Sequence, residues 1–298
     1  MIWLIGNKGM LGNEVCRTLL KSKIDFVGTD SEVSILDYSA LESFAAEKSV
    51  SFIVNCAAYT AVDKAESDVD FARKLNADGP RNIARLAKKL GVPFIHISTD
   101  YVFDGTASSP IAEDAPIKPI GVYGETKAEG EKAIAQETSD FYILRTAWLY
   151  GWSGKNFVYT MIRAMNTHES VKVVNDQKGT PTNCVTLASV ILNIIQKRLG
   201  GQTVPNGIYN VTDLGEITWF DFTKEILAQG AENGLIMNKT CVVNPCTTAE
   251  YPTPAKRPAY SVLDKSKTQK TLGIELPDWK ESLKVFLNSD LFDKSRVE

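Results

Sequence analysis

Short apolar runs alternate with longer helical patterns through the first 150 residues, and this alternation limits the fold more than any other feature of the chain. Strand-like runs cover residues 1–5, 25–28, 51–55, 92–98 and 141–145, and helical patterns cover residues 10–22, 70–90 and 123–138. Strands that are apolar on both faces and alternate with helices are typical of a parallel sheet with helices on both sides. The sequence therefore predicts an α/β fold with a doubly wound parallel sheet.

A glycine-rich turn joins the first predicted strand to the first predicted helix. Gly6, Gly9 and Gly12 follow a G-x-x-G-x-x-G spacing, and such glycines let the backbone and the helix N-terminus approach a pyrophosphate. Asp30, just past the second strand, can bind a ribose hydroxyl and favours NADH, whereas Lys8 beside a 2′-phosphate would favour NADPH. The turn thus predicts a Rossmann-type site for NADPH or NADH, with the preference left open.

The pattern changes after residue 151. Strands are still predicted at 171–174 and 208–211, with a helix at 186–199 between them, but the chain from residue 218 on is richer in turns and prolines. We predict a dinucleotide-binding domain of residues 1–150, to which 171–212 adds. Residues 151–170 and 213–298 are predicted to form a smaller C-terminal substrate-binding lobe. The last residues, from 290 on, are expected to form a frayed tail.

A tyrosine and a lysine four residues apart mark the predicted catalytic helix. Tyr123 and Lys127 would share one helix face. A lysine cation and a positively charged nicotinamide ring would both lower the tyrosine pKa from its usual value near 10. Thr99 lies at the carboxyl end of the fourth strand, where ligands of open α/β sheets collect. We therefore predict that Tyr123, supported by Lys127, delivers a proton to a substrate carbonyl oxygen to which Thr99 donates a hydrogen bond.

Composition excludes several other classes of protein. A formal net charge of −3 gives no electrostatic footprint for nucleic acid, and no run approaches the roughly 20 apolar residues of a membrane helix. The N-terminal apolar run is too short for a signal peptide. The five cysteines are scattered without a zinc spacing, and of the two histidines, His96 lies inside a strand and is expected to be a satisfied core residue. We expect a cytoplasmic protein without a metal site.

Several longer motifs together resemble one family. They are GNKGMLG (6–12), NCAAYTAVDKAE (55–66), STDYVFDG (98–105), PIGVYGETKAEGE (119–131), LRTAWLYG (144–151), NDQKGTPT (175–182) and YPTPAKRP (251–258). The chain resembles the extended short-chain dehydrogenases/reductases and, more narrowly, the dTDP-4-dehydrorhamnose reductases. This resemblance implies reduction of the C4 ketone of a dTDP-linked 4-keto-6-deoxysugar, dTDP-4-dehydro-L-rhamnose.

The resemblance also implies roles for individual residues. The cofactor would be lined by Met10, Leu11, Gly12, Asp30, Asp37, Tyr38, Ala57, Ala58 and Tyr59, besides Gly6, Gly9, Tyr123 and Lys127. The sugar nucleotide would meet Thr99, Asp100 and Trp148. The planar guanidinium of Arg257 is a candidate for the diphosphate, with an ordinary surface arginine as the alternative.

Other interpretations stay open. Some members of the family are linked with dimers that magnesium bridges through scattered carboxylates. Glu14 stands at the position of one of these carboxylates, but the segment 183–185 contains no acid where the pattern would require another. A homodimer without the metal remains open. An epimerase or dehydratase of the same fold is an alternative, although a dehydratase would carry a second acid after Asp100, where Tyr101 stands. A regulatory subunit without catalysis, as in methionine adenosyltransferase, is another.

Overall fold

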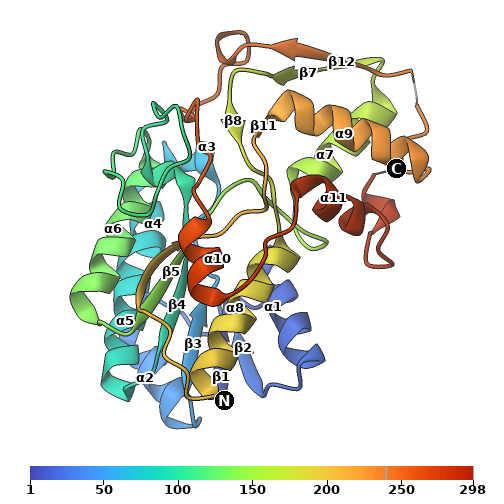
Figure 1. Ribbon diagram of the computed structural model, residues 1–298. Helices are drawn as coiled ribbons and strands as arrows, with labels where there is room; N and C mark the ends of the chain where they lie inside the picture. The colour runs from blue at the N-terminus through green and yellow to red at the C-terminus, as the bar shows by residue number, and fades with distance from the viewer. Residues whose placement is uncertain (239, 298) are drawn as a thin grey trace.

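A central parallel sheet organises the computed structural model, which describes residues 1–238 and 240–297. Within these residues the strands follow the order β10-β5-β4-β3-β1-β2 (Figure 1). They are β1 (Ile2–Ile5), β2 (Phe26–Thr29), β3 (Phe52–Asn55), β4 (Phe94–Thr99), β5 (Phe141–Thr146) and β10 (Gly207–Asn210). The chain leaves β1 in one direction and resumes at β3 on the other side, so a switch point lies between them. The predicted Rossmann-type α/β fold is confirmed.

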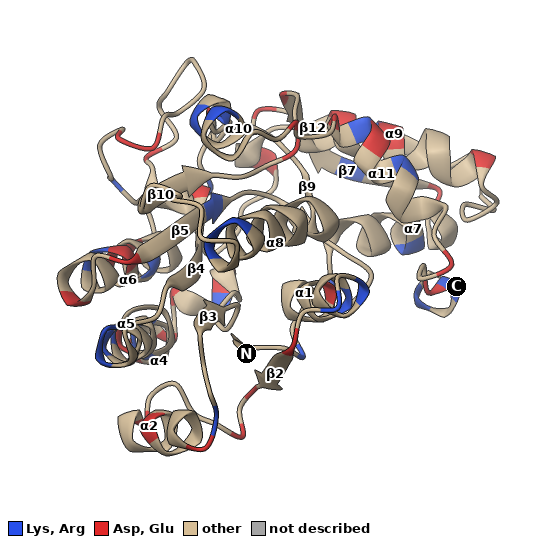
Figure 2. Ribbon diagram, turned by 60° about the horizontal axis from the view of Figure 1, so that its bottom comes forward, with Lys and Arg blue, Asp and Glu red and all other residues tan. Residues whose placement is uncertain are grey.

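Alternating side chains of β1 show why this sheet needs helices on both faces. Ile2 and Leu4 pack with α1 (Met10–Lys21) and α8 (Cys184–Leu199), whereas Trp3 and Ile5 pack with α2 (Tyr38–Ala46) and α5 (Gly79–Leu90). Figure 2, which turns the molecule by 60°, shows α1 on one side of the sheet and α2 and α5 on the other. The β1 run is buried throughout, which is why the sequence shows it as continuously apolar.

The helix predicted over residues 70–90 forms in three parts. These are α4 (Val69–Arg73), a π-helical turn (Lys74–Asp78) and α5, which ends at Gly91 with a left-handed φ of 66°. The other elements on the sheet are α3 (Val62–Ala65), α6 (Val122–Glu137) and α10 (Ser266–Leu272), and a short 3₁₀ turn (Asp100–Val102) follows β4.

A smaller lobe packs beyond one end of the sheet, at the top of Figure 1. Its helices are α7 (Phe157–Thr167), α9 (Trp219–Glu232) and α11 (Trp279–Leu287), with 3₁₀ turns at Thr248–Glu250 and Lys294–Arg296. Its strand pairs are β7 (Ser170–Val174) with β12 (Val242–Cys246), β8 (Lys178–Gly179) with β11 (Ile217–Thr218), and β6 (Leu149–Tyr150) with β9 (Thr182–Asn183). Hydrogen bonding thus divides the segment 171–212, which the sequence assigned to the sheet domain as one block. Helix α8 and β10 join the sheet, whereas β7 finds its partner in β12 of the lobe.

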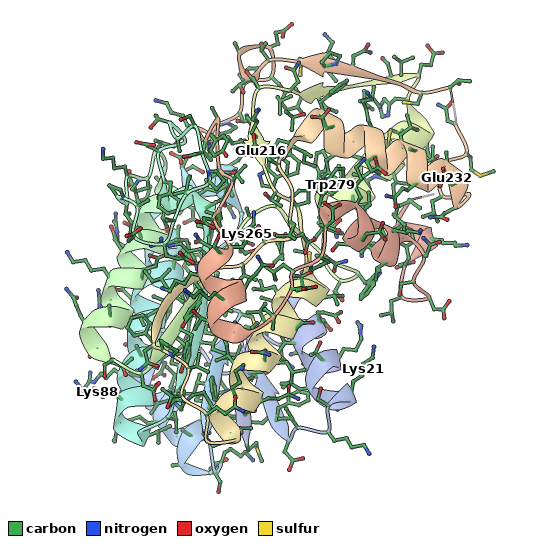
Figure 3. The ribbon with its side chains drawn as sticks, in the orientation of Figure 1. Lys21, Lys88, Glu216, Glu232, Lys265 and Trp279 are labelled. Atoms are coloured by element: carbon green, nitrogen blue, oxygen red, sulfur yellow. The ribbon has the colours of Figure 1, made fainter. Side chains whose placement is uncertain are left out.

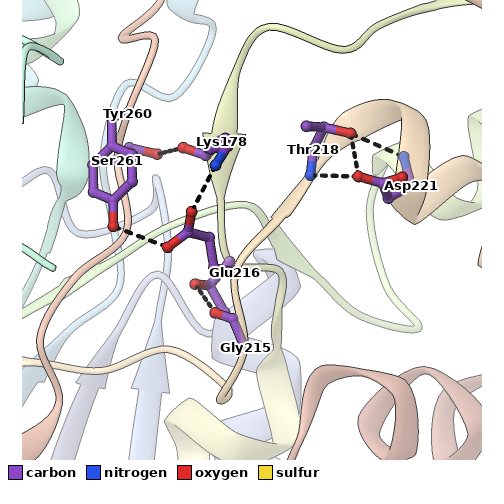
Figure 4. Close-up of polar contacts among 8 residues, drawn as sticks. Lys178, Gly215, Glu216, Thr218, Asp221, Tyr260 and Ser261 are labelled. Atoms are coloured by element: carbon purple, nitrogen blue, oxygen red, sulfur yellow. Dashed lines mark hydrogen bonds and ion pairs between the residues drawn. The ribbon is translucent and has the colours of Figure 1, made fainter. Parts of the chain in front are cut away.

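Polar contacts fix the short β8–β11 ribbon to the C-terminal part of the chain (Figure 4). Glu216 accepts from the Lys178 ammonium at 3.0 Å and from the Tyr260 hydroxyl at 3.0 Å. The Ser261 amide donates to the Lys178 carbonyl at 2.8 Å. In Figure 3, Glu216 lies near this ribbon and Trp279 lies within the lobe, whereas Lys21 and Lys88 point outward from the helices on the sheet. Residues 260 and 261 therefore hold the ribbon through Lys178 of β8 and through Glu216, which precedes β11.

The end of the described chain is packed, so the expectation of a frayed tail is wrong. Phe292 and Val297 are buried in the core of the lobe. The guanidinium of Arg296 lies 3.7 Å from the centre of the Tyr159 ring and donates to the Trp152 carbonyl at 2.6 Å. These contacts join residues more than 130 positions apart, which no local pattern reveals.

No helix in the described parts of the chain combines the length and the apolar character needed to cross a membrane. In the same residues, no three His, Cys, Asp or Glu side chains gather as they would around a metal ion.

Candidate active site

A cavity of about 780 Å³ lies at the carboxyl edge of the sheet, between the sheet and the lobe. Segments that follow β1 to β5 all reach it, because parallel strands bring their carboxyl ends to one edge. The predicted residues that line it are Gly6, Gly9, Met10, Leu11, Asp30, Ala57, Ala58, Thr99, Asp100, Tyr123, Lys127 and Trp148. The structure thus brings together twelve side chains and backbone positions that the sequence placed in one site.

The glycine turn forms the floor of this cavity. Gly6 has a left-handed φ of 79°, and a Cβ there would lie 2.6 Å from the backbone nitrogen of Ala57. A Cβ on Gly12 would lie 2.0 Å from the carbonyl oxygen of Gly6, so Gly12 brings α1 close to the turn without lining the cavity. Helix α1 begins at Met10, after Gly9, which offers no side chain to cap its first N–H groups. An open helix N-terminus behind small residues fits the diphosphate of a dinucleotide.

Helix α6 presents the predicted catalytic pair. Tyr123 and Lys127 lie one turn apart and both line the cavity. A Cβ on Gly124 would lie 2.1 Å from the carbonyl oxygen of Tyr101, so glycine lets α6 lie directly against the chain after β4. The rings of Tyr101 and Tyr123 meet edge to face with centroids 5.4 Å apart. This contact holds the phenol at the end of β4, beside Thr99.

The electrostatics of the site keep the phenol protonated. Burial raises the pKa of Tyr123 to about 12, the Thr99 hydroxyl acts in the opposite direction, and Asp100 raises the pKa further. Lys127 was expected to lower this pKa, but its Nζ donates to the Ile97 carbonyl at 2.6 Å and is not among the groups that shift the tyrosine. A neutral phenol is the form that donates a proton during a reduction.

Two buried oxygens in this site have no partner in the described chain, Oδ2 of Asp100 and Oγ1 of Thr146. The other carboxylate oxygen of Asp100 accepts from the Thr99 hydroxyl at 2.9 Å, and burial raises the Asp100 pKa to about 6. Thr146 ends β5 directly opposite Thr99 and also lines the cavity. Buried polar atoms are nearly always hydrogen-bonded, so a polar ligand fits here. Sequence reasoning missed Thr146, although its place at a strand end was the available signal.

The lobe contributes an aromatic wall. Trp148 and Trp219 stack with ring centroids 3.6 Å apart and planes within 10°, and both line the cavity. Trp148 has a left-handed φ of 47°, and a Cβ on Gly179 would lie 2.5 Å from its ring. Trp219 opens α9, whose first turn is fixed by the capping box of Thr218 and Asp221 (Figure 4). Trp219 belongs to no motif, so sequence reasoning missed it.

Besides Gly12, three residues implied for the cofactor lie outside the cavity lining. Asp37 caps α2 by accepting from the Ala40 amide at 3.0 Å. The Arg85 guanidinium lies over the Tyr38 ring, 4.5 Å from the ring centre. The Tyr59 hydroxyl donates to Asp68 at 3.1 Å. Each therefore makes a structural contact at the rim, and a cofactor role for these three stays a prediction.

Arg257 is also outside the lining, because it pairs with an acid of the sheet domain. Its guanidinium donates to both carboxylate oxygens of Asp63, at 2.9 and 3.1 Å. A diphosphate would have to share this guanidinium with Asp63 or replace it. The role of Arg257 toward substrate stays a prediction.

The groups bearing on cofactor preference lie together. Asp30 lines the cavity and accepts from the Lys8 amide at 3.3 Å. The Lys8 ammonium pairs with Glu32 at 3.1 Å, and both side chains are mostly exposed. Such a pair is weak, so Lys8 remains free to exchange Glu32 for a phosphate.

Comparison with known proteins shows which family these features represent. The family model described as the RmlD substrate binding domain matches residues 1–291. A dTDP-4-dehydrorhamnose reductase of Escherichia coli K12 is 38% identical, with 99% of each chain covered. The crystal structure of a dTDP-4-dehydrorhamnose reductase from Clostridium acetobutylicum superposes with a TM-score of 0.89 at 42% identity, covering 96% of this chain and 98% of that one. One from Bacillus anthracis, solved in complex with NADP, gives 0.88 at 34% identity and covers 96% and 97%. The chain therefore belongs to the RmlD substrate binding domain family, together with these dTDP-4-dehydrorhamnose reductases.

Proposed function

We propose that this protein uses NADPH or NADH to reduce the C4 ketone of dTDP-4-dehydro-L-rhamnose, giving dTDP-L-rhamnose. The observation that carries the proposal is the convergence of Thr99, Tyr123 and Lys127 on a cavity whose floor is the glycine turn. Relatives that share the whole length of the chain bear the name of this activity, and one of them binds NADP.

The reduction needs one hydride and one proton. When bound, the reduced nicotinamide supplies the hydride to the ketone carbon. Tyr123 donates its phenolic proton to the ketone oxygen, so a C–H and an O–H bond replace the π bond of the carbonyl while the C–O single bond remains. Thr99, beside the phenol, would donate a hydrogen bond to the same oxygen in place of Asp100, its acceptor in this structure. Lys127, one turn further along α6, lines the same cavity and would hold the nicotinamide ribose.

The sugar nucleotide would occupy the lobe side of the cavity. The unpartnered oxygen of Asp100 can accept from a sugar hydroxyl, and that of Thr146 can accept or donate. The stacked Trp148 and Trp219 offer an apolar wall for the 6-deoxy carbon. Arg257 would serve the diphosphate by exchanging Asp63 for it.

The direct test is the loss of NADPH or NADH absorbance when purified protein meets dTDP-4-dehydro-L-rhamnose. Substrate-dependent oxidation with either cofactor, and a product identified as dTDP-L-rhamnose, is the expected result. An epimerase or dehydratase would transform the sugar without net consumption of cofactor. A regulatory subunit would bind cofactor and turn over neither substrate. Either of those outcomes rejects the proposal.

A further inference from the structure

His96 is a buried, titratable residue that the mechanism above does not use. It lies on β4 and is 1% exposed. One ring nitrogen, Nδ1, is 3.1 Å from Nδ2 of Asn55, and the other, Nε2, is 3.2 Å from Nζ of Lys127. The histidine therefore links the end of β3 to the lysine of the reductase site.

Asn55 decides which nitrogen of His96 carries the proton. Its side-chain Oδ1 accepts from the backbone amide of Ala57 at 3.0 Å, and this turns its NH₂ group toward His96. An amide NH₂ can only donate, so Nδ1 must accept, and a neutral imidazole then carries its proton on Nε2. Burial, the largest cause, lowers the pKa of His96 well below its usual value and keeps the ring neutral.

The Nε2–H group therefore points at Lys127. An ammonium has donors and no lone pair, so a charged Lys127 would place two donors face to face at 3.2 Å. An uncharged amine can accept from Nε2–H while it donates to the Ile97 carbonyl at 2.6 Å. The hydrogen-bond geometry thus favours the amine form of Lys127.

Other groups around Lys127 set the pH above which the amine form predominates, which is about 8. Glu131, one turn along α6, is the acid that favours the ammonium, but burial has the larger effect, and together they lower the Lys127 pKa to about 8. The Glu131 carboxylate is already held by the Arg145 guanidinium at 2.6 and 2.9 Å and by the Ser98 hydroxyl at 2.6 Å.

We propose that His96 is a positioning residue of this site: locked by Asn55 with its proton on Nε2, it disfavours the ammonium form of Lys127 and keeps that lysine able to take up a proton when cofactor binds. Ribose hydroxyls can accept from an ammonium, which His96 in this tautomer cannot. The inference rests on the proposed cofactor site, but its test needs no turnover.

The tautomer can be observed directly, because the chain has only two histidines, His96 and His168. In protein labelled with ¹⁵N-histidine, the His168→Gln variant leaves the signals of His96 alone. We expect the Nε2–H pattern of a neutral ring that does not titrate between about pH 6 and 9. The Nδ1–H pattern, or a ring that becomes cationic in this range, would overturn the proposal.

The effect on Lys127 is measured by calorimetry of NADH binding in buffers of different ionisation enthalpy. NADH is the probe because it lacks the titrating 2′-phosphate. At about pH 8.5 the wild-type protein should take up roughly three quarters of a proton, given a Lys127 pKa of about 8. Lys127→Met should abolish this uptake. Failure of NADH to bind at all would instead count against the cofactor site itself.

Asn55→Asp is the matched variant for the tautomer. Its carboxylate still accepts from the Ala57 amide, but it also accepts from Nδ1–H of His96, which moves the ring proton to Nδ1 and leaves Nε2 free to accept from Lys127. We expect the ¹⁵N pattern to change and the proton uptake to fall at least twofold. The double variant with His96→Leu shows how much of that fall comes from the added charge alone. A changed tautomer with unchanged uptake would show that His96 does not act on Lys127.

Discussion

Different kinds of chemical groups line the two sides of the cavity. The sheet side, next to the glycine turn, consists of backbone and small residues such as Gly6, Gly9 and Ala57. The lobe side presents the large rings of Trp148 and Trp219. Main-chain N–H groups and a helix N-terminus recognise a phosphate whatever else it carries, whereas an aromatic wall distinguishes ligands by shape and apolar surface.

Because of this difference, substitutions on the two sides of the cavity should affect different ligands. On the sheet side, atoms lie so close that an added methyl group at Gly6 would collide with the backbone of Ala57. On the lobe side, the wall consists of two stacked rings, Trp148 and Trp219. We therefore expect substitutions on the lobe side to alter sugar-nucleotide recognition and those on the sheet side to alter cofactor binding, with Tyr123 acting where the two ligands meet.

The largest expected effect is that of Tyr123→Phe. Loss of the proton donor should reduce kcat by about 10²- to 10⁴-fold, while the Kd for NADPH stays near the wild-type value because the ring itself remains. Stopped-flow turnover and a fluorescence titration of cofactor measure the two quantities. Tyr101→Phe, which removes the hydroxyl of the neighbouring ring, is the control and should lose much less. Full turnover in Tyr123→Phe would reject the assignment.

A buried acid, Asp213, at the junction between the sheet and the lobe should make the free energy of unfolding depend on pH. Asp213 is fully buried where the chain passes from β10 to the lobe, and it accepts from the Thr186 hydroxyl at 2.5 Å and the Asn183 amide at 3.1 Å. Burial raises its pKa from 3.8 to about 7. Between these two values the unfolded chain has lost the proton and the folded chain keeps it, so the free energy of unfolding falls as pH rises from about 4 to about 7.

The contribution of Asp213 is on the order of 4 kcal/mol across that range, from the difference between the two pKa values. Urea denaturation of the wild type and of Asp213→Asn at several pH values measures it. The variant should lose this part of the pH dependence, whatever its stability at one pH. Parallel curves for the two proteins would contradict the burial argument.

On the lobe side, Trp219→Ala should raise the KM for the sugar nucleotide about tenfold, since an aromatic contact contributes roughly 0.5–1.5 kcal/mol beyond its buried area. Trp148 loses its stacking partner in this variant and its ring is no longer held. The Kd for NADPH should not change, and Trp219→Phe should recover most of the affinity. An equal loss of cofactor and substrate binding would mean that the two sides are not independent.

The smallest effect is expected from Asp30→Asn on the sheet side. The carboxylate favours a ribose hydroxyl and repels a 2′-phosphate, so the KM for NADH should rise a few-fold while that for NADPH stays constant or falls. The same variant should leave the KM for the sugar nucleotide unchanged. Steady-state kinetics with both cofactors measures this preference, and a shift toward NADH would contradict it.

The sheet side could be predicted because its residues are consecutive in the chain. A strand, a glycine turn and a helix follow one another within residues 1–22, and Tyr123 and Lys127 lie on one helical turn. These features depend on local periodicity and on the conformational freedom of glycine, and both can be recognised within a short stretch of sequence. The fold class was predicted correctly for the same reason, whereas the family was predicted from the resemblance of whole motifs such as NDQKGTPT and YPTPAKRP.

The amino-acid sequence by itself thus determined the parallel sheet, the glycine turn and the site residue Thr99 at the end of β4. Only the tertiary structure decided the pairing of β7 with β12, the stack of Trp148 on Trp219, the clasp of Arg257 on Asp63 and the contact of His96 with Lys127. The partners in these contacts stand about 30 to 190 positions apart. Each contact joins segments that are distant in the chain, and packing between distant segments leaves no periodic signal in either one.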